Sequence, residues 1–133
     1  MQINDPDVVA ELTVLYPLYE TALVTNDVDA LVRMFWASPH VVRFGATENL
    51  YGIEEIEAFR KGRSPANLAR KVERMQVVAF GKDFGSITLE FSREKDGVVT
   101  RGRQSQVWAR LPEGWRIAMA HVSILAAASE RRA

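Results

Sequence analysis

The hydrophobic periodicity of this chain changes at about residue 70, and the change restricts the folds that are open to it. Up to that point apolar residues recur at steps of three and four, which is typical of helices with one buried face. Beyond it they alternate with polar residues, which is typical of strands in a sheet with one buried face. Helices followed by strands predict an α+β fold, a cone in which three helices pack on a strongly curved antiparallel sheet.

The predicted helices span residues 5 to about 25, a short segment that begins after the capping residue Asp27, and residues 53 to about 62. A short strand hairpin within residues 41–52 separates the second helix from the third. Four long strands follow, and the strong turn signal Asp96-Gly97 joins the second of them to the third. These strands are expected at residues 72–81, 87–92, 98–111 and 115–125, and residues 128–133 are expected to be frayed.

At 133 residues the chain is expected to be one domain, residues 1–133, with no linker or repeat. Its 17 basic and 17 acidic residues balance, which argues against nucleic acid or a membrane surface as the main partner. The absence of cysteine excludes disulfides, thiolate nucleophiles and cysteine-built metal sites. There is neither a signal-like amino terminus nor an apolar run of membrane-spanning length, so the expected location is the cytoplasm.

The common catalytic signatures are missing from the sequence. It contains no HExxH pair, no glycine-rich phosphate loop and no GxSxG elbow. Its two histidines, His40 and His121, lie far apart, and no acidic cluster is visible. We therefore expect no metal and no cofactor, and any catalysis has to come from other groups.

Arg43 is the first candidate for a functional residue, because it interrupts the apolar strand VVRF at residues 41–44. A buried guanidinium is costly unless its charge meets a partner. One interpretation is structural, with the charge paired to a buried acid such as Glu90 or Glu20. The other is functional, with the guanidinium unpaired in the protein and binding a substrate carboxylate or a developing oxyanion at the mouth of the cone. The functional prediction depends on the second interpretation.

Tyr19 is the second candidate, and it lies on the apolar face of the first predicted helix. A tyrosine in this position is often a core aromatic, and Tyr16, one turn earlier, is the competing choice. Beside the guanidinium of Arg43, however, the phenol would have a lowered pKa, because a nearby cation favours phenolate. Tyr19 is therefore a candidate general base or proton donor.

Three residues of the long strand at 98–111 are candidates for substrate contacts. Gln104, Gln106 and Trp108 share one face of it, since side chains alternate with a period of two. The two amides offer donors and acceptors to a ligand. The same face could instead meet solvent or a second subunit.

Asn49, His121 and Arg60 complete the set of predicted substrate contacts. Asn49 follows a turn, where it either forms the turn or touches the substrate. His121 is expected to share a face of the last strand with Ile117 and Met119, and it is either structural or functional. Arg60 and Arg63 project from the third helix and are expected in solvent, with Arg60 in reach of the mouth as a second anion contact.

Three segments of the chain resemble known proteins, and together they cover nearly its whole length. They are FWASPHVVRFGATENLYGIEEIEAFR at residues 35–60, RGRQSQVWAR at 101–110 and GWRIAMAHVS at 114–123. The last is similar to the wide superfamily of NTF2-like, SnoaL-like or ketosteroid-isomerase-like cones. The first two resemble the AtzH-like family more narrowly.

The resemblance implies a small decarboxylating amidohydrolase of cyanuric acid or oxalurate (ureide) catabolism. The implied reaction is hydrolysis of 1,3-dicarboxyurea to urea-1-carboxylate, without a metal. It further implies that a tyrosine of the first helix and an arginine of the following strand are the catalytic pair, here Tyr19 and Arg43. Residues 46–47 and 84–93 depart from the family's pattern, which affects the expected shape of the pocket.

Two other functions are compatible with the same cone. One is a non-catalytic module that binds a small acid or serves as an accessory subunit of an amidohydrolase complex. The other is isomerase or dehydratase chemistry, which would need His121 or Glu90 as the base.

A homodimer is also expected, because three helices cannot cover both faces of the sheet. A second copy would meet either the three apolar residues of the strand at 87–92 or Val107 and its neighbours. The three residues are Ile87, Leu89 and Phe91. Association with an amidase of the same pathway is a further expectation drawn from the resemblance.

Overall fold

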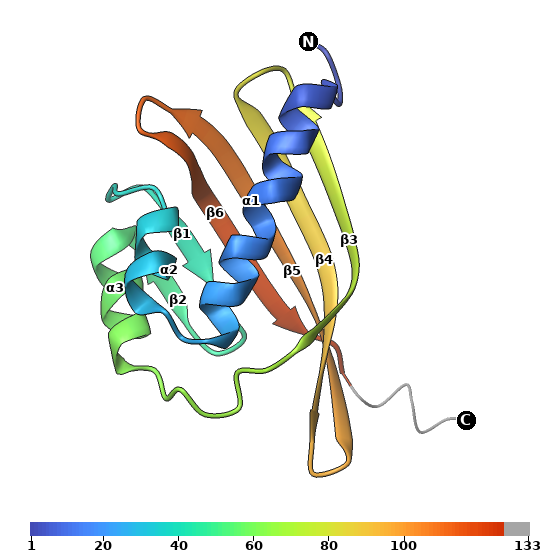
Figure 1. The fold of residues 1–133 in the computed structure, drawn as a ribbon. Helices are drawn as coiled ribbons and strands as arrows, with labels where there is room; N and C mark the ends of the chain where they lie inside the picture. The colour runs from blue at the N-terminus through green and yellow to red at the C-terminus, as the bar shows by residue number, and fades with distance from the viewer. Residues whose placement is uncertain (127–133) are drawn as a thin grey trace.

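A computed structural model describes residues 1–126 as three helices and six strands (Figure 1). The predicted elements all occur, within a few residues of their expected bounds, and the prediction for residues 128–133 lies outside the described residues. In chain order the elements are α1 (Pro6–Val24), α2 (Val28–Met34), β1 (Val42–Phe44), β2 (Asn49–Tyr51), α3 (Gly52–Gly62), β3 (Lys71–Phe80), β4 (Phe84–Lys95), β5 (Val98–Leu111) and β6 (Gly114–Ile124).

Acidic caps fix the starts of the first two helices. The Asp5 carboxylate accepts from the backbone N–H of Asp7 at 2.9 Å, and Pro6 fits the first turn because its missing N–H would be unpaired there. Asp27 accepts from the N–H of Ala30 at 3.2 Å, which confirms the predicted cap. Within residues 1–126 no helix combines the length and the hydropathy that crossing a membrane would need.

The six strands form one sheet in the order β2-β1-β6-β5-β4-β3. The four long strands pair antiparallel, as predicted. The expectation of a wholly antiparallel sheet is wrong at one seam, where β1 pairs parallel with β6 and places Arg43 beside Ala120. A three-residue strand carries no sequence signal for its direction, so this pairing could not be read from the chain.

One face of the sheet is covered by the helices, with α1 lying along it as Figure 1 shows. Ile87, Leu89 and Phe91 of β4 point into this covered face and are buried. The prediction that these three residues meet a second copy is therefore wrong. Because side chains alternate along a strand, Ser86, Thr88 and Glu90 lie on the opposite, outer face of β4. Val107 of β5 is half-buried on this outer face, where it is the register partner of Ser86.

Gly102 in β5 allows the Phe91 ring to pack directly on the backbone of the neighbouring strand. The two residues are register partners, and a Cβ at position 102 would overlap the ring. The guanidinium of Arg70 lies over the same ring, 4.4 Å from its centroid. Phe91 thus forms part of the floor beneath an interior arginine.

A shift in the pairing of β6 with β5 changes which side chains face the core. Ala118 has no partner across the strands, so the alternation restarts after it. Ile117 is buried, whereas Met119 and His121 are exposed on the outer face. The predicted shared face of Ile117 and His121 is therefore wrong, because it assumed an unbroken period of two.

Candidate functional site

The centre of the site is a hydrogen bond between α1 and α3. The Nη2 of Arg60 donates to the hydroxyl of Tyr19 at 2.9 Å. Tyr19 is 2% exposed and Arg60 is 0% exposed, so both groups are removed from water. The expectation that Arg60 is solvated is wrong, because Arg60 follows the buried Ile56 by one helical turn and lies on the same inward face of α3.

Four other arginines lie close enough to Tyr19, or to one another, for their charges to interact. They are Arg43 in β1, Arg63 at the end of α3, Arg70 just before β3 and Arg93 in β4. Only two carboxylates, those of Glu20 and Glu48, pair with any of them in the described part of the chain. We term these four arginines and Arg60 the arginine cluster.

Arg43 is buried, as the strand pattern predicts, but it is not free of internal partners. Its Nη1 donates to the Glu48 carboxylate at 2.7 Å, so the partner is neither of the acids considered from the sequence. The interpretation of a guanidinium unpaired in the protein, on which the functional prediction depended, is therefore wrong. Glu48 folds back over Gly45, where a Cβ would collide with its carboxylate, and Thr47 Oγ1 donates to it at 2.8 Å. The Nε of Arg43 remains buried without a partner within residues 1–126.

Glu48 itself is 17% exposed at the side chain and stays ionised despite partial burial. Burial acts to raise the pKa of this carboxyl, but the hydrogen bonds from Thr47 and Arg43 outweigh it and hold the pKa below its usual value. The loop from Gly45 to Glu48 thus places a carboxylate of the protein beside Arg43, the residue that was expected to bind a ligand.

Arg70 was missed by the sequence analysis, and it is the most fully partnered member of the arginine cluster. It donates to both oxygens of Glu20 at 2.8 Å, to Gln104 at 2.9 Å and to the Tyr16 hydroxyl at 3.2 Å. These partners lie 34 to 54 residues away in the sequence, so no local pattern could have indicated them. The arrangement is that of a structural ion pair.

Gln104, Gln106 and Trp108 share one face of β5, as predicted, and the structure shows that this face is buried. Gln104 donates to the Tyr16 hydroxyl at 2.9 Å and accepts from Arg70, so its hydrogen bonds are used inside the protein. Gln106 accepts from the Trp108 indole N–H at 2.9 Å, and its Nε2 has no partner among the described residues. Gln106 is the member of the three with a donor left for a ligand.

Asn49 and His121 do not belong to the site. Asn49 alternates with the half-buried Leu50 in β2 and is exposed on the outer side. His121 is also exposed, and its ring packs edge-on against Phe44 at 5.8 Å. Glu90, the other base required for isomerase chemistry, is exposed as well, so neither base of that alternative lies in the interior.

Tyr16 and Tyr19 sit one turn apart on α1, but their surroundings act on them in opposite directions. Burial raises the pKa of Tyr16, whose hydroxyl donates to Glu20 at 2.7 Å. Burial also acts to raise the pKa of Tyr19, but the charges of Arg60, Arg43 and Arg70 outweigh it and leave the pKa below the usual value. The two phenols therefore have pKa values shifted in opposite directions, upward by burial at Tyr16 and downward by the arginines at Tyr19.

The unpartnered buried atoms around the cluster have one property in common. Within residues 1–126 they are all nitrogen donors, and none is an acceptor. They are Arg43 Nε, Arg60 Nε, Arg60 Nη1, Arg93 Nε and Gln106 Nε2. Buried donors without partners are costly, and such a set complements a ligand with several acceptor oxygens and negative charge. No three histidine or acidic side chains converge in this part of the chain to hold a metal.

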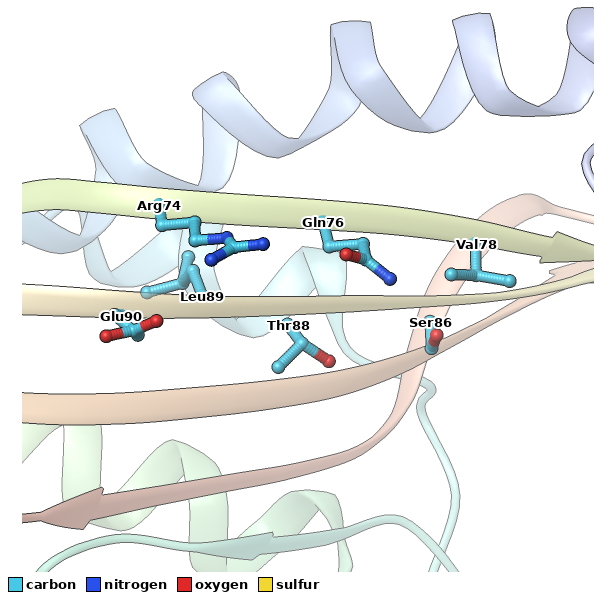
Figure 2. Close-up of a pocket in the computed structure, with 7 residues that line it drawn as sticks. All are labelled: Arg74, Gln76, Val78, Ser86, Thr88, Leu89 and Glu90. Carbon is cyan, nitrogen blue, oxygen red and sulfur yellow. The ribbon is translucent and has the colours of Figure 1, made fainter.

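A separate hollow of about 340 Å³ lies on the outer face of β3 and β4 (Figure 2). Polar side chains line it, among them Arg74 and Glu90, and they point away from α1 in the figure. Because Tyr19 lies on the covered face of the sheet, this hollow is not part of the arginine cluster.

Three helices on a six-stranded, mostly antiparallel sheet define an NTF2-like α+β fold. The chain belongs to the AtzH-like family, whose model matches residues 1–128. Among solved structures it is similar to a protein of unknown function, of the DUF3225 family, from Pectobacterium atrosepticum. The two are 45% identical with a TM-score of 0.89, over 93% of this chain and 95% of that one.

Two further solved structures show the same fold. A cystatin-like fold protein from Burkholderia xenovorans is 43% identical, with a TM-score of 0.87 over 95% of this chain and 98% of that one. An NTF2-like superfamily protein from Salmonella enterica is 24% identical, with a TM-score of 0.75 over 91% and 93%. Among curated proteins, none is similar enough in sequence to be matched to this chain.

Proposed function

We propose that the chain is a metal-independent amidohydrolase that removes a carboxylate from a small dicarboxylated urea. The reaction is the hydrolysis of 1,3-dicarboxyurea to urea-1-carboxylate, which is the activity that the AtzH-like resemblance implies. The observation that carries the proposal is the Tyr19 hydroxyl held by the buried Arg60 among guanidinium groups. A proton donor beside buried guanidinium groups that keep unpartnered N–H donors suits an anionic substrate whose leaving nitrogen must be protonated.

In the proposed step Arg43 binds a substrate carboxylate through its unpartnered Nε, with a charge-assisted hydrogen bond. The bond between the urea nitrogen and its carboxyl carbon breaks, the electron pair stays on nitrogen, and carbon dioxide leaves. Tyr19 gives its proton to that nitrogen, and the resulting phenolate is stabilised by Arg60. Water returns a proton to Tyr19, and the hydroxide that remains adds to the carbon of the released carbon dioxide to give bicarbonate, so the net reaction consumes one water.

The test is an assay of carbon dioxide and urea-1-carboxylate release from 1,3-dicarboxyurea. Tyr19→Phe keeps the ring and removes the hydroxyl, and we expect it to lose most of the activity. Arg43→Lys keeps the charge but loses the planar fork, and a large loss is expected there too. Near-full activity of Tyr19→Phe, or no turnover by the wild-type protein, would contradict the proposal.

The second candidate is a non-catalytic module that binds a small acid, either alone or as an accessory subunit. The pairing of Arg43 with Glu48 favours it over catalysis, because an internal carboxylate already offsets the positive charge that would stabilise a transition state. The two candidates differ in one measurement. A binding module would be stabilised against heat by carboxylates without any Tyr19-dependent turnover.

We further propose that a second copy of the chain covers the outer face of the sheet. Val107 and Met119 are paired neighbours on this face, and Met119 is 40% exposed. Analytical ultracentrifugation tests the assembly, and a monomer would contradict it. Val107→Asp is expected to weaken the dimer, because it places a charge in an apolar contact.

A further inference from the structure

We propose that residues 64–69 form a lid over the Tyr19 site, and that the buried side chain of Leu68 holds this lid closed. The segment lies between α3 and β3, and a small ligand reaches Tyr19 when the segment opens. This inference rests on the proposed function, because it takes the Tyr19 site as the place where the ligand binds. It concerns access to that site rather than the identity of the ligand or the bond that is broken.

The groups at the centre of the site are closed to solvent in this structure. Tyr19 and Arg60 are buried, and so are Gln104 and Gln106 of β5. A ligand from solution can contact the Tyr19 hydroxyl only if part of the surrounding protein moves. Lids that open and close on such a site are commonly loops between regular elements.

The proposed lid joins two members of the arginine cluster. Arg63, just before it, lies over the Phe59 ring at 5.9 Å, and its charge interacts with Tyr19. Arg70, just after it, also acts on Tyr19 through its charge. Figure 1 shows the segment crossing from the end of α3 to the start of β3, past the carboxyl end of α1. The segment therefore borders the site at the end of α1 that carries Tyr19.

The lid is held less firmly than the other loop beside the cluster. In that other loop, the backbone N–H of Gly45 donates to the carbonyl of Glu48 at 2.8 Å. Within residues 1–126, by contrast, no backbone hydrogen bond joins residues 64–69 to a helix or a strand. The hydrogen bond that the lid does form is internal, from the N–H of Ala66 to the Ser64 hydroxyl at 3.2 Å.

Leu68 is the apolar anchor of the lid. Five of the six side chains in residues 64–69 are exposed, and Leu68 is the exception at 5%. A segment with one buried side chain and no bonds to regular elements opens locally, at a lower free energy than global unfolding. The carboxyl end of the segment stays in place during this opening, because Arg70 is fixed by its ion pair with Glu20. Shortening Leu68 should therefore favour the open lid without disturbing β3.

The absence of cysteine allows opening to be measured by thiol labelling without background. Tyr19→Cys places a single thiol beneath the lid, and its reaction with iodoacetamide reports how often the site opens. Labelling is expected to be far slower than in concentrated urea. Adding Leu68→Ala is expected to speed it about tenfold, because less apolar surface is lost from the core on opening. Low concentrations of urea should change the rate little, since a local opening exposes little surface.

Val8→Ala in the same Tyr19→Cys background is the matched control. Val8 is buried near the start of α1, at the opposite end of the helix from Tyr19. The change lowers the stability of the whole chain without touching the lid. It is expected to leave the labelling rate in the absence of urea unchanged.

Several outcomes would overturn the inference. Labelling of Tyr19→Cys as fast as in concentrated urea would mean that the site is open without any lid. Labelling that Leu68→Ala does not accelerate, or that Val8→Ala accelerates equally, would remove the role of Leu68. A rate that rises with urea as steeply as global unfolding would exclude a local opening. If Tyr19→Cys does not fold, Gln106→Cys places the thiol on the buried face of β5 and the same comparisons apply.

The same data separate this inference from the proposed function. A labelling rate that depends on Leu68, with no turnover of dicarboxyurea, removes the hydrolase and leaves the lid. Turnover that depends on Tyr19, with a labelling rate unaffected by Leu68→Ala, removes only the lid.

Discussion

Replacing Arg60 with methionine is expected to raise the pKa of Tyr19. The substitution removes the guanidinium that donates to the phenol oxygen at 2.9 Å and whose charge favours the phenolate. A hydrogen bond from a charged group is worth roughly 1.5–3 kcal/mol, and one pKa unit corresponds to about 1.4 kcal/mol. The expected rise is therefore about one to two units.

Absorbance titration of the phenolate measures this shift. The chain has three tyrosines, and subtracting the titration of Tyr19→Phe isolates the signal of Tyr19. The wild-type difference signal is expected to have its midpoint below the value of about 10 for free tyrosine, and Arg60→Met should move it upward. Arg33→Met serves as the control for loss of one positive charge elsewhere.

Two results would refute this reasoning. A wild-type midpoint above that of free tyrosine would mean that burial outweighs the arginines. An unchanged midpoint in Arg60→Met would mean that the hydrogen bond does not stabilise the phenolate.

The lowered pKa of Tyr19 also predicts how stability varies with pH. A group whose pKa is lower in the folded chain binds fewer protons there than in the unfolded chain, so stability rises with pH between the two values. The unfolding free energy of wild type relative to Tyr19→Phe should increase as pH rises from the folded pKa toward about 10. The increment should disappear as pH falls through the folded pKa, and urea unfolding at several pH values measures it.

Three other substitutions test separate parts of the structure. Glu48→Gln removes the internal carboxylate that competes for Arg43, and calorimetry should show binding of malonate, a small dicarboxylate, tightened about fivefold. Gly102→Ala places a methyl group against the buried phenylalanine ring above it, and urea unfolding should show a loss of about 1–3 kcal/mol. His121→Ala changes an exposed residue of the outer face, and the turnover assay should show unchanged activity.

Matched controls exist for the first two of these changes. Glu57→Gln removes an acid of α3 whose partner is Lys61 and should not affect malonate binding. Gly62→Ala adds a methyl group with no atom within 4 Å and should be near neutral. Weaker malonate binding by Glu48→Gln would show that Glu48 positions Arg43 rather than competing for it, and an unchanged stability of Gly102→Ala would mean that the ring above it can move.

Periodicity predicted most of the fold, because helices and strands with one buried face repeat their apolar residues at fixed steps. It placed Tyr19 on the inward face of the first helix and Gln104 on one face of the long strand with Gln106 and Trp108, and the structure shows that both faces are buried. It failed at His121, because the unpaired Ala118 in β6 reverses the alternation. A single inserted residue leaves no clear mark in a strand that is apolar on both sides of it.

The arginines of the site show where sequence reasoning was limited. Arg43 could be identified because a charge in an apolar strand is conspicuous, but its partner Glu48 depends on a turn that brings residues 45 and 48 together. Arg60 had a usable signal, since it lies one turn after Ile56 on the inward face of α3. Arg70 had none, because it follows a loop and gains its partners only from distant elements.

The parallel seam between β1 and β6 has a consequence for how the protein is made. It joins residues 42–44 to residues 119–121, so the hairpin of β1 and β2, which carries Arg43, joins the long strands only when the last strand is available. Closing so long a loop is slow relative to local pairing. During synthesis on the ribosome, the residues of α1 and α3 emerge before those of β6. We therefore expect Arg43 to reach its final position beside Ala120 at a late step of folding.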